Sequence, residues 1–178
     1  KKLIALDPFC QTGLQWSRIF SDEAEYLEMW DIEPLAVKYA KKEFPAAIVK
    51  CGNSIDAIVN CKFGRKDFNF IILDTPVPYQ YIDGSFEHFS FFEHIFNNIA
   101  NNAVIIMNVV TDIRPILSKH PNSTEFVDNW VKAREFFYGV DNGSLILPQI
   151  MTEIYKEKIK KICFNVNLVT YSARNELV

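Results

Sequence analysis

The chain has few of the residues that mark metal-binding, disulfide-rich and membrane proteins. It has only three histidines and four cysteines, and no two cysteines form a Cys-x-x-Cys pair, so the usual spacing of a zinc site is missing. The cysteines are widely separated, which favours reduced thiols over a disulfide framework. No apolar run is long enough to cross a bilayer. We therefore expect no metal, no membrane partner and a cytoplasmic location.

Strong charge of one sign is also absent. The net charge is -3 and the pI is about 5.6, so no overall field attracts nucleic acid, although a local basic face is compatible with this balance. Hydrophobic residues make up 49% of the chain, a share that indicates a globular and not a disordered protein. A chain of 178 residues can bury a sizeable core. We expect a single domain over residues 1–178.

Apolar runs and amphipathic segments alternate regularly along the sequence. The runs predict strands at residues 2–8, 26–32, 46–51, 68–74, 103–111 and 163–171. The segments between them predict helices at residues 14–21, 34–44, 54–60, 90–98, 124–137 and 148–161. This order predicts an α/β fold, with a mostly parallel central sheet and helices on both faces. The runs at 68–74 and 103–111 are almost wholly apolar, so we expect these two strands to be central.

The first apolar run ends in an acid and a short turn. The turn is part of the segment Asp7-Pro8-Phe9-Cys10-Gln11-Thr12-Gly13, and an amphipathic stretch follows it. A strand, a tight loop and a helix in this order begin an α/β nucleotide-binding unit. The segment resembles the Asp-Pro-Phe-Cys-Gly-Thr-Gly loop of S-adenosylmethionine-dependent methyltransferases, especially those that methylate amino groups of nucleic-acid bases. Gln11 stands where that family has its first loop glycine.

This resemblance implies a Rossmann-like methyltransferase fold with S-adenosylmethionine as the cofactor. Asp7 would then reach the methionine amine, directly or through water. Phe9, Cys10 and Gly13 would form the rest of the cofactor loop, where small residues let the backbone approach the ligand. Gln11 would point outward or would bond the cofactor tail through its amide. In this fold two more strands end the sheet, so residues 163–171 would form the first and residues 176–178 would begin a last strand that is cut off.

An acid at the end of the second predicted strand fits the ribose of the cofactor. Asp31 follows Gly13 by 18 residues, close to the spacing of roughly 20 residues in dinucleotide-binding folds. A carboxylate at this position can accept hydrogen bonds from both ribose hydroxyls. The sequence Asp31-Ile32-Glu33-Pro34 before a helix resembles the ribose segment of the family, and Ile32 would flank the adenine or belong to the core. Glu33 is the alternative ribose acid, and a plain helix-start charge also explains it.

An amide follows the third predicted strand. Asn53 can accept a hydrogen bond from the adenine amine through its carbonyl oxygen, and Ser54 lies beside it. The family often has an acid at this place. A helix-capping Asn-Ser pair explains the two residues equally well.

The fourth predicted strand is followed by Asp74-Thr75-Pro76-Val77-Pro78-Tyr79. Amino-methyltransferases carry Asp/Asn-Pro-Pro-Tyr there, whose polar head accepts hydrogen bonds from the target amine while the aromatic ring stacks on the base. The present segment has these residue types but is two residues longer. The resemblance therefore implies Asp74, Pro76 and Tyr79 as acceptor-site residues, with Asp74 orienting the amine or acting as base. A proline-containing exit loop with Tyr79 in the core is the structural alternative.

The resemblance thus implies a methyltransferase acting on an amino group of a nucleic-acid base, with DNA or RNA as partner. Such a transfer needs proximity, orientation and removal of a proton from the acceptor. Two alternatives stay open: a methyltransferase-like interaction module with weak or no catalysis, which Gln11 favours, and a methyltransferase of small molecules or proteins. His88 and His94 are more simply explained as partly buried or surface residues than as a general base.

Overall fold

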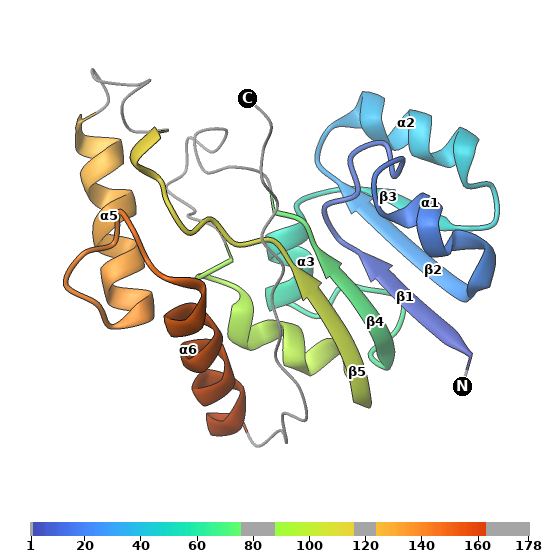
Figure 1. Ribbon diagram of the computed structural model, residues 1–178. Helices are drawn as coiled ribbons and strands as arrows, with labels where there is room; N and C mark the ends of the chain where they lie inside the picture. The colour runs from blue at the N-terminus through green and yellow to red at the C-terminus, as the bar shows by residue number, and fades with distance from the viewer. Residues whose placement is uncertain (1, 76–87, 116–123, 163–178) are drawn as a thin grey trace. The chain divides into compact units, whose positions relative to one another are not determined.

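The computed structural model describes residues 2–75, 88–115 and 124–162 (Figure 1). The chain divides into two compact units, one formed by Lys1–Gln80 with Ser90–Asn108 and the other by Tyr81–Phe89 with Val109–Val178. The expected strand at 163–171 and the start of a last strand at 176–178 lie outside the described residues. The prediction of one methyltransferase-like domain over residues 1–178 stays a prediction, because compact units can belong to one domain.

The first unit contains a five-stranded parallel sheet with the strand order β3-β2-β1-β4-β5. Its strands are β1 (Leu3–Asp7), β2 (Ala24–Asp31), β3 (Ile48–Cys51), β4 (Phe68–Leu73) and β5 (Ile99–Met107). The chain runs outward from β1 to β3 and then returns to place β4 on the other side of β1. Ligands of open α/β sheets bind outside the carboxyl ends of the strands at such a reversal. The fold therefore directs attention to the ends of β1 and β4.

Helices cover both faces of this sheet (Figure 1). One face carries α1 (Ser17–Phe20), the 3-10 helix η1 (Ser21–Glu23) and α2 (Pro34–Glu43), and the other carries α3 (Ser54–Val59) and the 3-10 helix η3 (Phe92–Asn98). The start of α2 follows from its sequence, because Pro34 has the backbone angle of a first helical residue and the Glu33 carboxylate accepts a hydrogen bond from the Leu35 amide at 3.4 Å. The predicted α/β architecture is confirmed.

Side chains alternate between the two faces along β2, as the pleat of a strand requires. Leu27 and Met29 join the buried cluster under α1 and α2. Trp30 lies on the other face, where its ring packs edge-on against Phe63 with 5.6 Å between ring centroids. Glu28 shares that face and is fully buried. Its carboxylate is stabilised by hydrogen bonds, of which the Trp30 indole N–H donates one to Oε1 at 2.8 Å, and by the Lys50 ammonium.

Two predicted elements differ from those observed. The segment expected as a helix at 90–98 forms the 3-10 helix η3, and β5 already begins at Ile99. Within the described residues β5 is the outermost strand and not a central one. Val104 and Ile106 on this strand are exposed by 55% and 37%. An apolar run therefore overstates how deeply this strand is buried.

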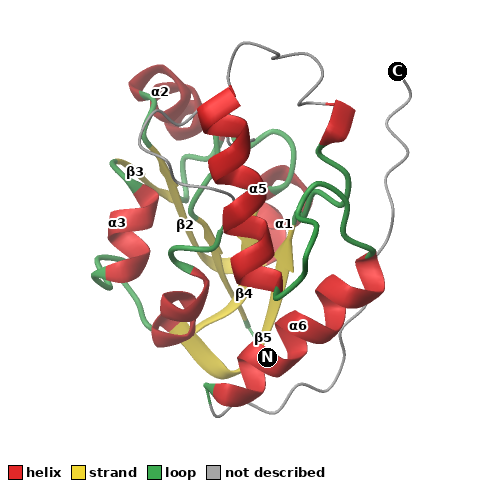
Figure 2. Cartoon of the chain, turned by 90° about the vertical axis from the view of Figure 1, so that its left-hand side faces the viewer, coloured by secondary structure: helices red, strands yellow, loops and turns green. Residues whose placement is uncertain are grey.

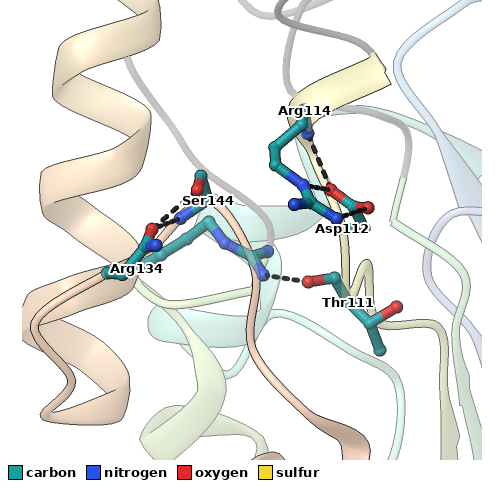
Figure 3. A network of polar contacts seen from close by, with 6 residues as sticks. Thr111, Asp112, Arg114, Arg134 and Ser144 are labelled. Carbon is teal, nitrogen blue, oxygen red and sulfur yellow. Dashed lines mark hydrogen bonds and ion pairs between the residues drawn. The ribbon is translucent and has the colours of Figure 1, made fainter.

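The second unit is built on two helices, α5 (Thr124–Tyr138) and α6 (Pro148–Lys161), which contact each other at an angle (Figure 2). Arg134 on α5 is fully buried and donates to the Gly143 carbonyl oxygen at 2.6 Å and to the Thr111 carbonyl oxygen at 3.4 Å (Figure 3). The nearby pair of Arg114 and Asp112 lies closer to solvent, with 2.7 Å between Nη2 and Oδ2. The buried guanidinium thus fastens two loops to α5.

His88 belongs to the same unit and is fully buried. Its Nε2 contacts the Tyr155 hydroxyl, which in turn lies 2.8 Å from the Tyr138 hydroxyl. Burial lowers the pKa of His88 to about 3, so the ring is neutral at physiological pH. The expectation of a partly buried or surface residue is wrong for His88, whereas His94 is exposed as expected. Both histidines have phenylalanines near them in the sequence, but only His88 is buried.

The conformation and surroundings of Gly13 generate a stability prediction. Its φ is +75°, and an added Cβ would lie 2.5 Å from Met29 Cε and 2.5 Å from Phe44 Cε2. We expect Gly13→Ala to lower the free energy of unfolding by about 2–4 kcal/mol, because left-handed backbone strain and overpacking add. Gly139→Ala is the matched control, since φ there is +65° with no atom within 4 Å; its loss should be about 1–2 kcal/mol. Urea unfolding measures both, and equal losses would contradict the packing argument.

Candidate functional site

Four polar residues lie at the carboxyl ends of four neighbouring strands of the first unit. Asp7 is the last residue of β1 and Asp31 the last residue of β2. Asn53 lies two residues beyond the end of β3, and Asp74 directly follows β4. Because the order of these strands is β3-β2-β1-β4, the four residues follow one another along a single edge of the sheet. The structure thus brings together the polar residues that the sequence singled out on separate strands.

Asp7 is the most unusual of these residues, because its carboxyl group is buried and only half satisfied. The side chain is 2% exposed. The Ser17 hydroxyl donates to Oδ2 at 2.5 Å, whereas Oδ1 meets no hydrogen-bond donor among the described residues. Burial raises the pKa of Asp7 to about 7, against the hydrogen bond from Ser17 and the dipole of the nearby Phe9 amide, and the charges of Asp74 and Asp31 raise it further. A cationic group at Oδ1 would complete the site.

Asp31 fixes the loop that follows β1. Its Oδ2 accepts from the backbone N–H of Gln11 at 2.7 Å, and its Oδ1 accepts from that of Glu33 at 2.8 Å. Gln11 has a φ of +48°, in the left-handed region that favours glycine. Its side chain is exposed, as the outward-pointing alternative requires. The backbone geometry explains why a glycine would suit this position without strain.

Two residues of the loop after β1 anchor its backbone in the core. Phe9 and Cys10 are both buried. The Phe9 ring packs on Phe91 with 5.4 Å between centroids, and the Cys10 N–H donates to the Trp30 carbonyl oxygen at 3.0 Å. Burial and the nearby charge of Asp7 raise the pKa of the Cys10 thiol, so it is protonated and unreactive. These two side chains shape the loop from within the core, and any contact they make with a ligand would come from their backbone.

The residues expected at an adenine are partly engaged in local structure. Asn53 Oδ1 accepts from the Asp56 N–H at 3.1 Å and caps α3, and Ser54 is buried in the first turn. The capping explanation is therefore confirmed for Asn53, whose amide oxygen keeps a second lone pair. Ile32 is 64% exposed and so has no core role. Glu33, the alternative ribose acid, is the N-cap of α2.

Asp74 is half-buried and held in place by an indole. The Trp16 Nε1–H donates to its Oδ2 at 2.9 Å across 58 residues of sequence. The adjacent Thr75 is tied to Asn108 after β5 by three hydrogen bonds of 2.9–3.1 Å, which fix the direction of the chain as it leaves β4. Pro76 and Tyr79, the other expected acceptor-site residues, lie outside the described residues.

Sequence reasoning missed three residues of this edge. Trp16 and Ser17 lie where α1 begins, in a stretch that the sequence marks only as amphipathic. Their partners Asp74 and Asp7 lie on two different strands, so the sequence gives no signal for either contact. Asn108 did carry a signal, because it is a polar residue near the end of an apolar run, as Asp7 and Asp74 are.

Two kinds of feature are missing from the described part of the chain. Residues 2–75, 88–115 and 124–162 contain no group of three or more His, Cys, Asp or Glu side chains that could hold a metal ion. None of the helices described here is long and apolar enough to span a membrane.

Solved methyltransferase structures share this fold, although no protein-family model and no curated protein sequence matches the chain. The plantazolicin methyltransferase BamL, in complex with a triazolic desmethylPZN analog and SAH, has a TM-score of 0.53 at 16% identity, over 88% of this chain and 54% of that chain. A SAM-dependent methyltransferase from Archaeoglobus fulgidus has a TM-score of 0.53 at 13% identity, over 88% of this chain and 60% of that chain. An S-adenosylmethionine-dependent methyltransferase from Clostridium acetobutylicum ATCC 824 has a TM-score of 0.52 at 16% identity, over 67% of this chain and 47% of that chain.

The chain thus spans 47–60% of the length of these three proteins. At identities of 13–16% the likeness shows the fold alone, and that fold is the Rossmann-like methyltransferase fold.

The strained backbone of Gln11 generates the second prediction. We expect Gln11→Gly to leave the free energy of unfolding almost unchanged, because relief of roughly 1 kcal/mol of left-handed strain offsets the roughly 0.5–1 kcal/mol entropic cost of glycine. Gln15→Gly is the matched control, since Gln15 is also an exposed glutamine of this loop but has a negative φ. It should lose roughly 0.5–1 kcal/mol in urea unfolding. A larger loss for Gln11→Gly than for Gln15→Gly would contradict the strain argument.

Proposed function

We propose that the chain is an S-adenosylmethionine-dependent methyltransferase that acts on an amino group of a nucleic-acid base. The observation that carries the proposal is the acidic edge of Asp7, Asp31 and Asp74, at the strand-order reversal of a methyltransferase fold. The loop resemblance from Asp7 to Gly13 supports the same cofactor. BamL, which shares the fold, was solved with SAH.

The residues present suit this cofactor. The buried Oδ1 of Asp7, which meets no donor among the described residues, matches the methionine ammonium, directly or through one water. The Asp31 carboxylate has lone pairs beyond the two that the loop amides use, and these suit ribose hydroxyls. The exposed Ile32 and the second lone pair of Asn53 suit the adenine. When bound, the cofactor supplies a methyl group on a sulfonium.

Asp74 is the residue we assign to the methyl acceptor. It follows β4 beside the strand-order reversal, and the Trp16 indole binds only its Oδ2. A carboxylate here can accept a hydrogen bond from an amine, orient its lone pair toward the methyl group and take up the proton that the amine loses. Pro76 and Tyr79 complete the proposal from the sequence, with the Tyr79 ring as a stacking surface for the base.

A methyltransferase-like interaction module is the second candidate. The observation that favours it is the engagement of Asp31 and Asn53 in local hydrogen bonds, because a ligand must share these groups with the backbone. Calorimetric titration with S-adenosylhomocysteine separates the two candidates. Binding supports the enzyme, whereas no heat at millimolar ligand favours the module. Methyl transfer to a small molecule or protein, with none to oligonucleotides, would keep the enzyme but replace the acceptor.

The third prediction tests the ribose acid. Asp31→Ala should weaken binding of S-adenosylhomocysteine about 100-fold or more, because charge-assisted hydrogen bonds to two hydroxyls contribute about 1.5–3 kcal/mol each. Glu33→Ala is the control, since Glu33 is the neighbouring acid and caps only α2. Calorimetry measures both affinities, and circular dichroism checks that both variants fold. A folded Asp31→Ala variant with unchanged affinity would rule out Asp31 as the ribose acid.

The fourth prediction tests the acceptor site. Asp74→Ala should lower methyl transfer to oligonucleotides about 100-fold or more, because removal of a positioned acid or base typically loses this much. Affinity for S-adenosylhomocysteine should change less than about threefold. Asp67→Ala is the matched control, because Asp67 precedes the same strand at its opposite end and pairs with Arg65 at the surface. Equal effects on turnover and affinity would place Asp74 at the cofactor instead.

A further inference from the structure

We propose that Ser17 is a positioning residue that holds Asp7 ready for a cationic amine, and that ligand binding expels a proton from Asp7. The inference rests on the proposed function, because it takes the amine to be that of S-adenosylmethionine or S-adenosylhomocysteine. It adds a residue and a proton that neither the loop resemblance nor the fold supplies.

The geometry around Asp7 separates its two carboxyl oxygens. Ser17 is fully buried, and its hydroxyl donates to Oδ2 at 2.5 Å, which fixes the rotation of the carboxyl group. Oδ1 is thereby left as the oxygen that meets no donor among the described residues. A buried acceptor without a donor is costly, and polar groups of this kind normally have partners. The ammonium of a bound ligand is the group that would satisfy Oδ1, while Oδ2 already has its donor in Ser17.

Glu28 shows that this arrangement is not a general property of buried acids in the sheet. It lies on β2 and is fully buried, yet both of its oxygens accept hydrogen bonds. The Tyr26 hydroxyl and the Gly64 N–H bind Oε2 at 2.8 and 2.9 Å, and the Lys50 ammonium lies 3.2 Å from Oε1. Both oxygens of the buried Glu28 therefore have hydrogen-bond donors, whereas Oδ1 of the buried Asp7 has none among the described residues.

The charges around Asp7 oppose its ionisation in the free protein. Asp31 at the end of β2 and Asp74 after β4 are the charged groups that act on it, and both are negative. The neighbouring Cys10 thiol is protonated. Burial is the largest effect, and the pKa of Asp7 is about 7. At pH 7 about half of the free molecules therefore carry a proton on Asp7.

The proton balance of binding follows from these charges. The protonated carboxyl gives its proton to the buffer, and the resulting carboxylate accepts a hydrogen bond from the ligand ammonium, which keeps all its protons. Because the positive charge of the ligand lowers the pKa of Asp7 in the complex, binding at pH 7 should release about half a proton. Below pH 7 affinity should fall by up to about tenfold per pH unit, and above pH 8 it should be constant.

Calorimetry of the whole chain with S-adenosylhomocysteine tests the inference. Titrations at pH 6, 7 and 8 in two buffers of different ionisation enthalpy give the number of protons released. Asp7→Asn should release fewer protons at pH 7 by about one half, and its affinity should no longer fall between pH 8 and pH 6. Any proton exchange by the ligand itself is common to both proteins and cancels in the difference.

Ser17→Ala separates positioning from packing. Loss of its hydrogen bond should raise the pKa of Asp7 further, so the pH profile of affinity should move to higher pH and affinity at pH 7 should fall severalfold, with partial recovery at pH 8. Ser21→Ala is the matched control, because Ser21 directly follows α1 and caps it through its backbone. It should leave the profile unchanged.

The outcomes separate the inference from the function beneath it. A pH-independent loss of affinity in Ser17→Ala would show a packing role and would overturn the positioning role. Binding of S-adenosylhomocysteine with the same proton release in wild type and Asp7→Asn would overturn the proton linkage and leave the methyltransferase proposal standing. No binding to the folded wild type at any of the three pH values would overturn both.

Discussion

The hydrogen bonds of the Asp31 carboxylate to the loop after β1 are the interaction on which the polar edge, formed by the strand-end residues Asp7, Asp31, Asn53 and Asp74, depends. Asp31 ends β2 and holds the amides of Gln11 and Glu33, so one side chain joins the loop after β1 to the start of α2. It also holds Gln11 in a conformation that L-residues seldom adopt. Gly13 closes the same loop against Met29 with no room for a side chain. The path of the backbone at the strand-order reversal is thereby fixed before any ligand arrives.

Burial of Asp7 at this edge lowers the stability of the fold at neutral and higher pH, where the carboxyl group is ionised. The pKa of Asp7 is about 7 in the folded chain and 3.8 in the unfolded chain. The folded state therefore binds more protons between these values, and the stability present below about pH 4 is lost as the pH rises through 7. A shift of about three pKa units corresponds to about 4 kcal/mol. Buried acids with a raised pKa cluster at functional sites, so this feature is consistent with the site proposed at this edge.

The fold was predictable wherever the sequence contains local signals. α2 and α6 begin at Pro34 and Pro148, because the fixed φ of proline suits the first helical position and its missing N–H has no partner there in any helix. The strands of the sheet appear as apolar runs, so their order along the chain followed from composition alone. The 3-10 helix η3 did not follow, because the apolar residues of its segment fit an α-helix equally well. The position of β5 depends on neighbours in space, which periodicity does not encode.

The polar edge was predictable in its acids but not in their partners. Asp7, Asp31 and Asp74 were visible because each interrupts an apolar run at the end of a strand. Ser17 and Trp16 were invisible, because nothing in a helical segment marks which strand its first turn will meet. These partners decide what the acids can do. Each donates to one oxygen of its carboxylate, so the first residue of α1 and the residue before it fix the orientation of two acids that follow different strands, as the proposed reaction requires.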